Sequence, residues 1–264
     1  MKGFQKSMGR IGFICLVIIC AAWLASPFFL DQLAFAAQPT TISWRDPDVV
    51  NIGTEQAPIS AILKTNAPSQ KIVLFSYGNA EDAGDIRHLL EAFERAGINA
   101  MAYDYPGYGL SHGKPTEKTV YAAADAAYRY LTEQGGYQPE NIIVVGRSIG
   151  SGPATYLAAK YPVGGLVILS GFTSMPRVVT GARLLPTDPF PNISRIGSIS
   201  APKLFIHGTD DRTISISHGK KLYDKASEPK QNVWVEGAGH NDVVDVMGED
   251  QFIKTIIDFA NKAK

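Results

Sequence analysis

The sequence predicts one α/β domain, in which a mostly parallel β-sheet carries helices on both faces. Short apolar runs alternate with helix-length amphipathic segments as far as the C-terminus, which is the pattern of a parallel sheet with crossover helices. Several of the runs are continuous Val, Ile, Leu and Phe, as expected for strands that are covered on both faces. With 264 residues, of which 45% are hydrophobic, the chain can bury one substantial core.

Each expected element follows from this alternation. The expected strands are residues 59–64, 71–76, 99–104, 141–146, 165–169, 203–207 and 232–236. The expected helices are residues 85–96, 117–134, 151–160, 217–226 and 250–263, each long enough to connect parallel strands. Residues 171–200 are rich in Pro and Arg without clear periodicity, so we expect a loop or a minimal lid there.

The N-terminus has the pattern of a targeting or anchoring segment. Lys2, Lys6 and Arg10 precede an apolar stretch over residues 11–30. Two interpretations remain open: a signal peptide cleaved after Ala34-Phe35-Ala36, or an uncleaved helix of about 20 residues that spans a bilayer. We therefore divide the chain into residues 1–36 and a folded domain over residues 37–264. The charge bias predicts that this domain lies outside the cytoplasm, either periplasmic, secreted or membrane-anchored.

Composition narrows the possible partners and cofactors. Basic and acidic residues number 25 each, so binding to nucleic acid is not expected. The two cysteines, Cys15 and Cys20, lie in the N-terminal segment, which leaves the folded domain without a disulfide or a thiolate ligand. The five histidines show no zinc-site spacing. We expect neither a metal nor an organic cofactor.

The strand expected at residues 141–146 leads into a nucleophile elbow. Residues 146–150 read Gly-Arg-Ser-Ile-Gly, and a helix-forming run follows at once. A serine on so tight a turn has a strained backbone, and glycines two residues to either side avoid collision with the neighbouring strand and helix. Ser148 is therefore the predicted nucleophile.

A serine hydroxyl needs a base and an orienting carboxylate, and both follow later strands. His240 comes after glycines directly beyond the last expected strand, which makes it the predicted base. His207 closes the preceding strand and is expected to order the loop that carries the acid. The acid is Asp211 or, less favoured, Asp210, with the other residue capping the turn.

An acyl-transfer site also needs backbone N–H groups for the oxyanion. We expect one from Ile149, directly after the nucleophile, and one from Asn79 in the loop after the strand at residues 71–76. Tyr77, Tyr105 and Tyr108 are candidates for lining the acyl pocket, with packing as the alternative role.

These residues resemble the α/β-hydrolase superfamily over residues 58–263, and in particular the membrane-tethered palmitoyl-protein thioesterases and their bacterial serine-hydrolase relatives. The resemblance rests on residues 78–80, 103–109, 146–150, 190–193, 207–211, 217–219 and, most specifically, 234–242. It implies an α/β-hydrolase fold and the triad Ser148, Asp211 and His240. Tyr77 stands where the family usually has His. The eukaryotic thioesterases are tethered by a cysteine cluster that faces the cytoplasm, whereas this N-terminus resembles an export or anchor signal.

We accordingly expect a serine esterase or thioesterase, lysophospholipase-like, that forms an acyl-enzyme on Ser148 with a small or lipid-like acyl ester. Ester hydrolysis is a better expectation than protein depalmitoylation, because the N-terminus is typical of export. A serine peptidase remains an alternative, since the same constellation cleaves amides. A non-catalytic binding protein of this fold is the second alternative. The N-terminal segment would allow membrane association.

Overall fold

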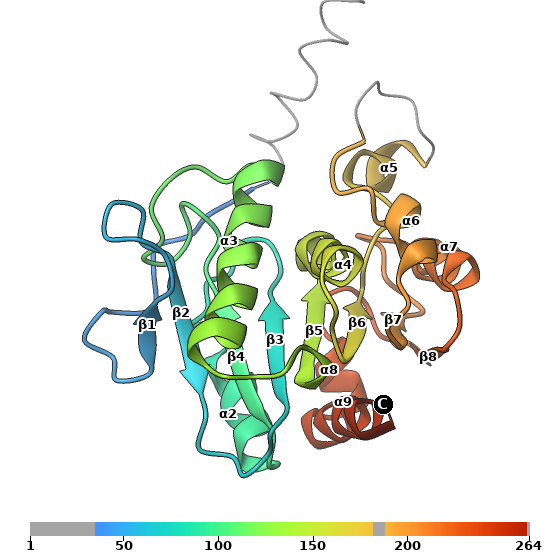
Figure 1. Cartoon of the computed structure of the whole chain (residues 1–264). Helices are drawn as coiled ribbons and strands as arrows, with labels where there is room; N and C mark the ends of the chain where they lie inside the picture. Colours follow the sequence, from blue (N-terminus) through green and yellow to red (C-terminus); the bar gives the residue numbers. More distant parts are fainter. Residues whose placement is uncertain (1–34, 182–187, 263–264) are drawn as a thin grey trace, which may run out of the picture.

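The computed structural model describes residues 35–181 and 188–262, which form one eight-stranded sheet with helices on both faces (Figure 1). The strand order is β1-β2-β4-β3-β5-β6-β7-β8. The pairs β1–β2 and β2–β4 are antiparallel, and the five remaining pairs are parallel. The predicted α/β class, with a mostly parallel sheet, is confirmed. The predicted leader, residues 1–36, lies outside the described residues except for Phe35 and Ala36.

The strands agree closely with the apolar runs of the sequence. They are β1 Val49–Asn51, β2 Ser60–Lys64, β3 Ile72–Ser76, β4 Asn99–Tyr103, β5 Ile142–Arg147, β6 Gly165–Leu169, β7 Lys203–Gly208 and β8 Lys230–Val235. Every residue of β3, β4 and β6 is buried, as continuous apolar strands in the middle of a sheet require. The edge strand β1, with three residues, is too short to show a pattern and was not predicted.

The helices are α2 Arg87–Arg95, α3 Glu117–Arg129, α4 Ser151–Lys160, α5 Met175–Thr180, α6 Asn192–Arg195, α7 Ile216–Lys225, α8 Val243–Met247 and α9 Glu249–Lys262. Helices α3 and α4 pack together on one face of the sheet, whereas α2 and α9 contact each other on the other face (Figure 1). The helix predicted to run to residue 134 ends its α-helical part at Arg129 and continues as a π-helical turn, Tyr130–Gln134.

The segment predicted as a loop or a minimal lid, residues 171–200, contains the short helices α5 and α6 in its described part. Helix α5 follows Ser174, has Pro176 in its first turn, and ends at Gly181, whose φ of 68° is left-handed. Proline early and glycine just after the end are ordinary helix boundaries. These helix boundaries could not be recognised from the sequence, because a helix of six residues is too short to show apolar periodicity.

No helix among the described residues is both long enough and apolar enough to cross a membrane.

Candidate active site

Strand β5 and helix α4 meet at a sharp turn that holds Ser148. Its φ is 53°, a left-handed conformation that is strained for any residue with a side chain. A Cβ on Gly146 would lie 2.4 Å from the carbonyl oxygen of Gly150, and a Cβ on Gly150 would lie 2.0 Å from that of Ser76. Both glycines are thus required for the close passage of strand, turn and helix, for the reason expected from the sequence.

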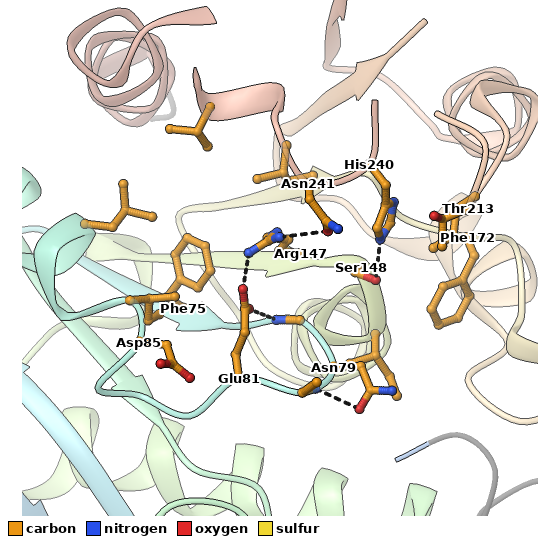
Figure 2. Close-up of a pocket in the computed structure, with 18 of the residues that line it drawn as sticks. Phe75, Asn79, Glu81, Asp85, Arg147, Ser148, Phe172, Thr213, His240 and Asn241 are labelled. Carbon is orange, nitrogen blue, oxygen red and sulfur yellow. Dashed lines mark hydrogen bonds and ion pairs between the residues drawn. The ribbon is translucent and has the colours of Figure 1, made fainter. Parts of the chain in front are cut away.

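The structure brings the three predicted triad residues together from loops that are far apart in the chain. Ser148 Oγ lies 2.9 Å from His240 Nε2, and His240 Nδ1 lies 2.7 Å from Asp211 Oδ2 (Figure 2 shows the first contact). The side chain of Asp211 is fully buried and that of His240 is 10% exposed. Because an ionised carboxylate only accepts hydrogen bonds, His240 Nδ1 carries the proton, and Nε2 is then free to accept the Ser148 hydroxyl.

The environment of Asp211 favours its ionised form. Burial alone would raise its pKa, but hydrogen bonds from His207, His240 and the Ile214 N–H outweigh burial and hold the pKa well below its ordinary value. His207 Nε2 lies 3.2 Å from Asp211 Oδ2 and 2.8 Å from the Ile214 carbonyl oxygen, so His207 orders the acid loop as expected. Asp210 is exposed, and its carboxylate contacts the Thr209 hydroxyl at 3.4 Å. The structure therefore places Asp211, and not Asp210, on His240.

The two predicted oxyanion residues lie beside the nucleophile. Ile149 and Asn79 both line the cavity that contains Ser148. A Cβ added to Gly78 would lie 3.8 Å from that of Ser148, so the loop after β3 passes directly over the elbow. The Asn79 side chain accepts hydrogen bonds from the Ala36 N–H at 2.9 Å and the Tyr108 hydroxyl at 2.7 Å. These contacts fix the loop, and its N–H groups remain the expected oxyanion donors.

The predicted placement of Tyr77, Tyr105 and Tyr108 along the acyl pocket is corrected, because all three are buried and lie outside the cavity lining. Their rings pack against one another, with centroids 4.6 to 6.4 Å apart. Tyr77 donates to Asp104 Oδ1 at 2.9 Å, and Tyr105 donates to the Tyr77 carbonyl at 2.7 Å. The three tyrosines therefore support the loop after β3 by packing, which is the alternative role that the sequence left open.

Asp104 is the buried polar centre of this support. Its carboxylate accepts hydrogen bonds from the Ser60 hydroxyl, the Ala83 N–H and the Tyr77 hydroxyl. Burial raises its pKa to about 6, although these hydrogen bonds act in the opposite direction. Gly109 passes so close that a Cβ there would lie 2.0 Å from Asp104 Oδ2.

A cavity of about 790 Å³ opens around Ser148, with walls of different character (Figure 2). On the side of Phe172 and helix α5 the lining is apolar and includes Met175, Val178, Val179 and Ile214. The rest of the lining is mixed: it includes Glu81, Asp85, His88, Asp245 and Glu249 together with the apolar side chains of Phe75, Ile86, Leu89 and Val244. Within residues 35–181 and 188–262, no group of three or more His, Cys, Asp or Glu side chains is placed to hold a metal ion.

The sequence analysis missed three residues near Ser148: Arg147, Glu81 and Asn241. Arg147 contacts both of the others (Figure 2). The signal was present in part, since Arg147 directly precedes the nucleophile and Asn241 directly follows His240. Their mutual contact depends on side-chain directions at three loops, which spacing does not reveal.

Comparison with known proteins agrees with this architecture. A family model described as serine aminopeptidase, S33, matches residues 67–187. Alpha/beta hydrolase domain-containing protein 17B of Homo sapiens is 44% identical over 174 residues, which cover 65% of this chain and 60% of the relative. The 17C protein of Mus musculus is 41% identical over 181 residues, covering 67% and 57%. The chain thus spans less than two thirds of the length of these relatives.

Solved structures show the same fold. An esterase from Pyrococcus furiosus matches with a TM-score of 0.71 and 20% identity, covering 86% of this chain and 99% of the esterase. An alpha-beta hydrolase from Vibrio vulnificus matches with a TM-score of 0.66 and 20% identity, covering 89% and 93%. The sequence relatives, the matching family model and the shared sheet agree, and the chain has the α/β-hydrolase fold.

Proposed function

We propose that this hydrolase cleaves carboxylic ester or thioester bonds through an acyl-enzyme on Ser148. The observation that carries the proposal is the continuous hydrogen-bond chain from Ser148 Oγ through the His240 ring to Asp211 Oδ2. A binding module has no need for a strained serine aligned with a base and a buried carboxylate. The combination is what nucleophilic catalysis by serine requires.

The reaction follows from the positions of these groups. Ser148 Oγ attacks the substrate carbonyl carbon while His240 Nε2 takes the hydroxyl proton, and the carbonyl electrons move to oxygen. The N–H groups of Ile149 and Asn79 stabilise that oxyanion. When the intermediate collapses, the bond to the alcohol or thiol breaks, and His240 returns the proton to the leaving group. Water, deprotonated by His240, then cleaves the acyl-enzyme and restores Ser148.

The cavity supports an acyl ester as substrate. Its apolar wall, beside Phe172 and helix α5, suits a hydrocarbon chain, because apolar surface removed from water favours binding. The opposite wall carries charged side chains, such as Glu81 and Asp85, beside apolar ones, and it suits a polar leaving group. We assign the acyl chain to the first wall and the alcohol or thiol to the second.

Peptide hydrolysis is the second candidate function. The matching family model is described as a serine aminopeptidase, and carboxylates such as Asp85 and Asp245 line the cavity, where they suit a substrate's terminal ammonium group. Comparing p-nitrophenyl esters of increasing chain length with aminoacyl p-nitroanilides separates the two activities. Faster turnover of the anilides would replace the ester assignment with the peptidase assignment.

The central test is labelling of the full-length protein with a fluorophosphonate probe, followed by mapping of the adduct by mass spectrometry. We expect a stoichiometric adduct on Ser148, and neither adduct nor turnover in Ser148→Ala. A well-folded wild-type protein that does not react would overturn the assignment and favour a binding function.

The proposal also covers the cellular location of the domain. The basic residues before the apolar stretch at residues 11–30 favour a domain outside the cytoplasm, associated with the membrane if the segment is retained. Alkaline phosphatase fused after residue 36 should be active in a bacterial host, since that enzyme needs export to fold. An inactive fusion would place the hydrolase inside the cell.

A further inference from the structure

The side chain of Arg147 connects three loops that meet at Ser148 (Figure 2). Arg147 is itself the last residue of β5 and directly precedes Ser148. Its Nη1 lies 2.5 Å from Glu81 Oε1 in the loop after β3, and its Nη2 donates to Asn241 Oδ1 at 3.2 Å in the loop after β8. Asn241 directly follows His240. One guanidinium thus contacts the loop with the expected oxyanion donor and the loop with the base.

Glu81 extends this connection into the oxyanion loop. While one carboxylate oxygen faces Arg147, the other, Oε2, accepts the backbone N–H of Gly78 at 2.9 Å. Gly78 is the residue before Asn79 and passes over Ser148. The Glu81 carboxylate therefore closes the turn that carries Asn79 and ties this turn to the nucleophile elbow. The Arg147 and Glu81 side chains are only 20% and 22% exposed.

We propose that Arg147 and Glu81 are positioning residues that set the oxyanion loop, the nucleophile and the base at reactive distances from one another. This inference rests on the proposed serine-hydrolase function. The three loops are separate in sequence, and displacement of a reacting group by about 1 Å can lower a rate about 100-fold. The planar guanidinium can bond Glu81 and Asn241 at once, which a lysine ammonium with one compact charge does less well.

If the ion pair between Arg147 and Glu81 were purely structural, its removal would have a different effect on the kinetics. Partly exposed pairs of this kind contribute little to stability, so their loss would leave turnover intact. The positioning role predicts instead that kcat falls much more than KM changes, because Arg147 and Glu81 line the cavity but act chiefly on the approach of the reacting groups to the transition state.

The experiment compares Arg147→Met, Glu81→Gln and the double variant with wild type in the full-length protein. Gln at position 81 keeps the shape of Glu but retains one acceptor oxygen, so it cannot serve both Arg147 and the Gly78 N–H. The matched control is Arg87→Met, which removes ion pairs to Asp46 and Asp48 at a similar exposure of 26%. For each protein, kcat, KM, the rate of fluorophosphonate reaction and the Tm are measured.

We expect each single variant to lose about 10- to 100-fold in kcat and in labelling rate, with KM changed less than about threefold. The double variant should be no slower than the slower single variant, since the pair acts as one unit. Arg147→Lys should recover part of the loss, because it keeps the charge and one of the two contacts. Arg87→Met should keep wild-type kcat whatever its Tm.

Three results overturn the inference alone. The first is single variants that retain kcat within about twofold, and the second is a control that loses as much kcat as they do. Multiplying losses in the double variant would also overturn it, because they would show independent roles. If Arg147→Met does not fold, Glu81→Gln decides the question. A wild-type protein that neither labels nor turns over ester would instead overturn the proposed function, and this outcome is distinct from the others.

Discussion

The Asp211 carboxylate allows a sharp prediction, because its surroundings decide how an asparagine would sit there. Asp211 Oδ1 accepts two backbone N–H groups, from Thr213 at 2.9 Å and from Ile214 at 2.7 Å. In Asp211→Asn the amide oxygen must occupy this position, since an NH₂ facing two donors would leave them unsatisfied at about 1 to 3 kcal/mol each. The amide nitrogen then faces His240.

That orientation reverses the donor and acceptor roles of the two ring nitrogens of His240. An NH₂ group donates, so His240 Nδ1 would have to accept, and the ring proton would move to Nε2. Nε2 lies 2.9 Å from Ser148 Oγ and could no longer take its proton. The corresponding change in the best-studied Ser-His-Asp triad lowers kcat by about 10⁴ through the same tautomer error. We expect a similar loss here, with the fold intact.

The assay is kcat/KM for a p-nitrophenyl ester, with circular dichroism to verify folding. Asp210→Asn is the matched control, because Asp210 is exposed and adjacent in the chain, and it should remain within about threefold of wild type. A loss below tenfold in Asp211→Asn, or an equal loss in Asp210→Asn, would refute the reasoning.

Three further predictions concern the support of the site. Gly150→Ala should destabilise the fold by at least about 1 to 3 kcal/mol in urea unfolding, because its Cβ would lie 2.0 Å from a backbone oxygen. Asp104→Asn should lack a pH dependence that wild type shows: a pKa raised to about 6 from its ordinary value of 3.8 costs wild type about 3 kcal/mol of stability as pH rises from 4 to 7. Ala36→Pro should lower kcat about fivefold, because it removes the N–H that donates to Asn79 Oδ1.

Each of these has its own control and contrary result. Gly197→Ala, where φ is not left-handed and the nearest atom to the added Cβ lies 3.3 Å away, should cost less than Gly150→Ala, and the opposite order would contradict the steric argument. Parallel pH curves for wild type and Asp104→Asn would mean that the carboxyl titrates near its ordinary pKa. Ala37→Pro should keep wild-type kcat, and equal losses in the two proline variants would point to chain stiffness instead of the hydrogen bond.

Much of the fold could be predicted because burial on both faces leaves a direct mark on the sequence. Seven of the eight strands lie within about two residues of a continuous apolar run. The order of strands in the sheet leaves no such mark, because it depends on which runs pair in space. Helices α5, α6 and α8 were missed for another reason: at four to six residues they are too short to show a helical period.

The residues of the site also fall into those that could be predicted from the sequence and those that could not. Ser148, Asp211 and His240 could be located because each follows a strand, and the carboxyl ends of parallel strands meet at one edge. The role of Tyr77 could not be predicted from the sequence, since an aromatic ring after a strand can turn either toward the cavity or beneath it. Its direction is set by Asp104, a buried acceptor 27 positions away whose partners are fixed only by the folded chain.

Ala36 donates a hydrogen bond to Asn79 in the loop that carries the expected oxyanion donor. Cleavage or retention of the N-terminal segment should therefore affect the reaction. Phe35 packs edge-on against Tyr108 and Phe190, so the chain enters the fold beside the tyrosine that bonds Asn79. A peptidase that cut after Ala36 would remove this residue and its hydrogen bond along with the leader. If the segment stays in a bilayer, Phe35 follows Leu30 by five positions, and at about 3.5 Å per position this spacing holds Phe35 within about 18 Å of the lipid. Processing would then yield a free enzyme with a looser oxyanion loop, and retention a tethered enzyme with a firmer one.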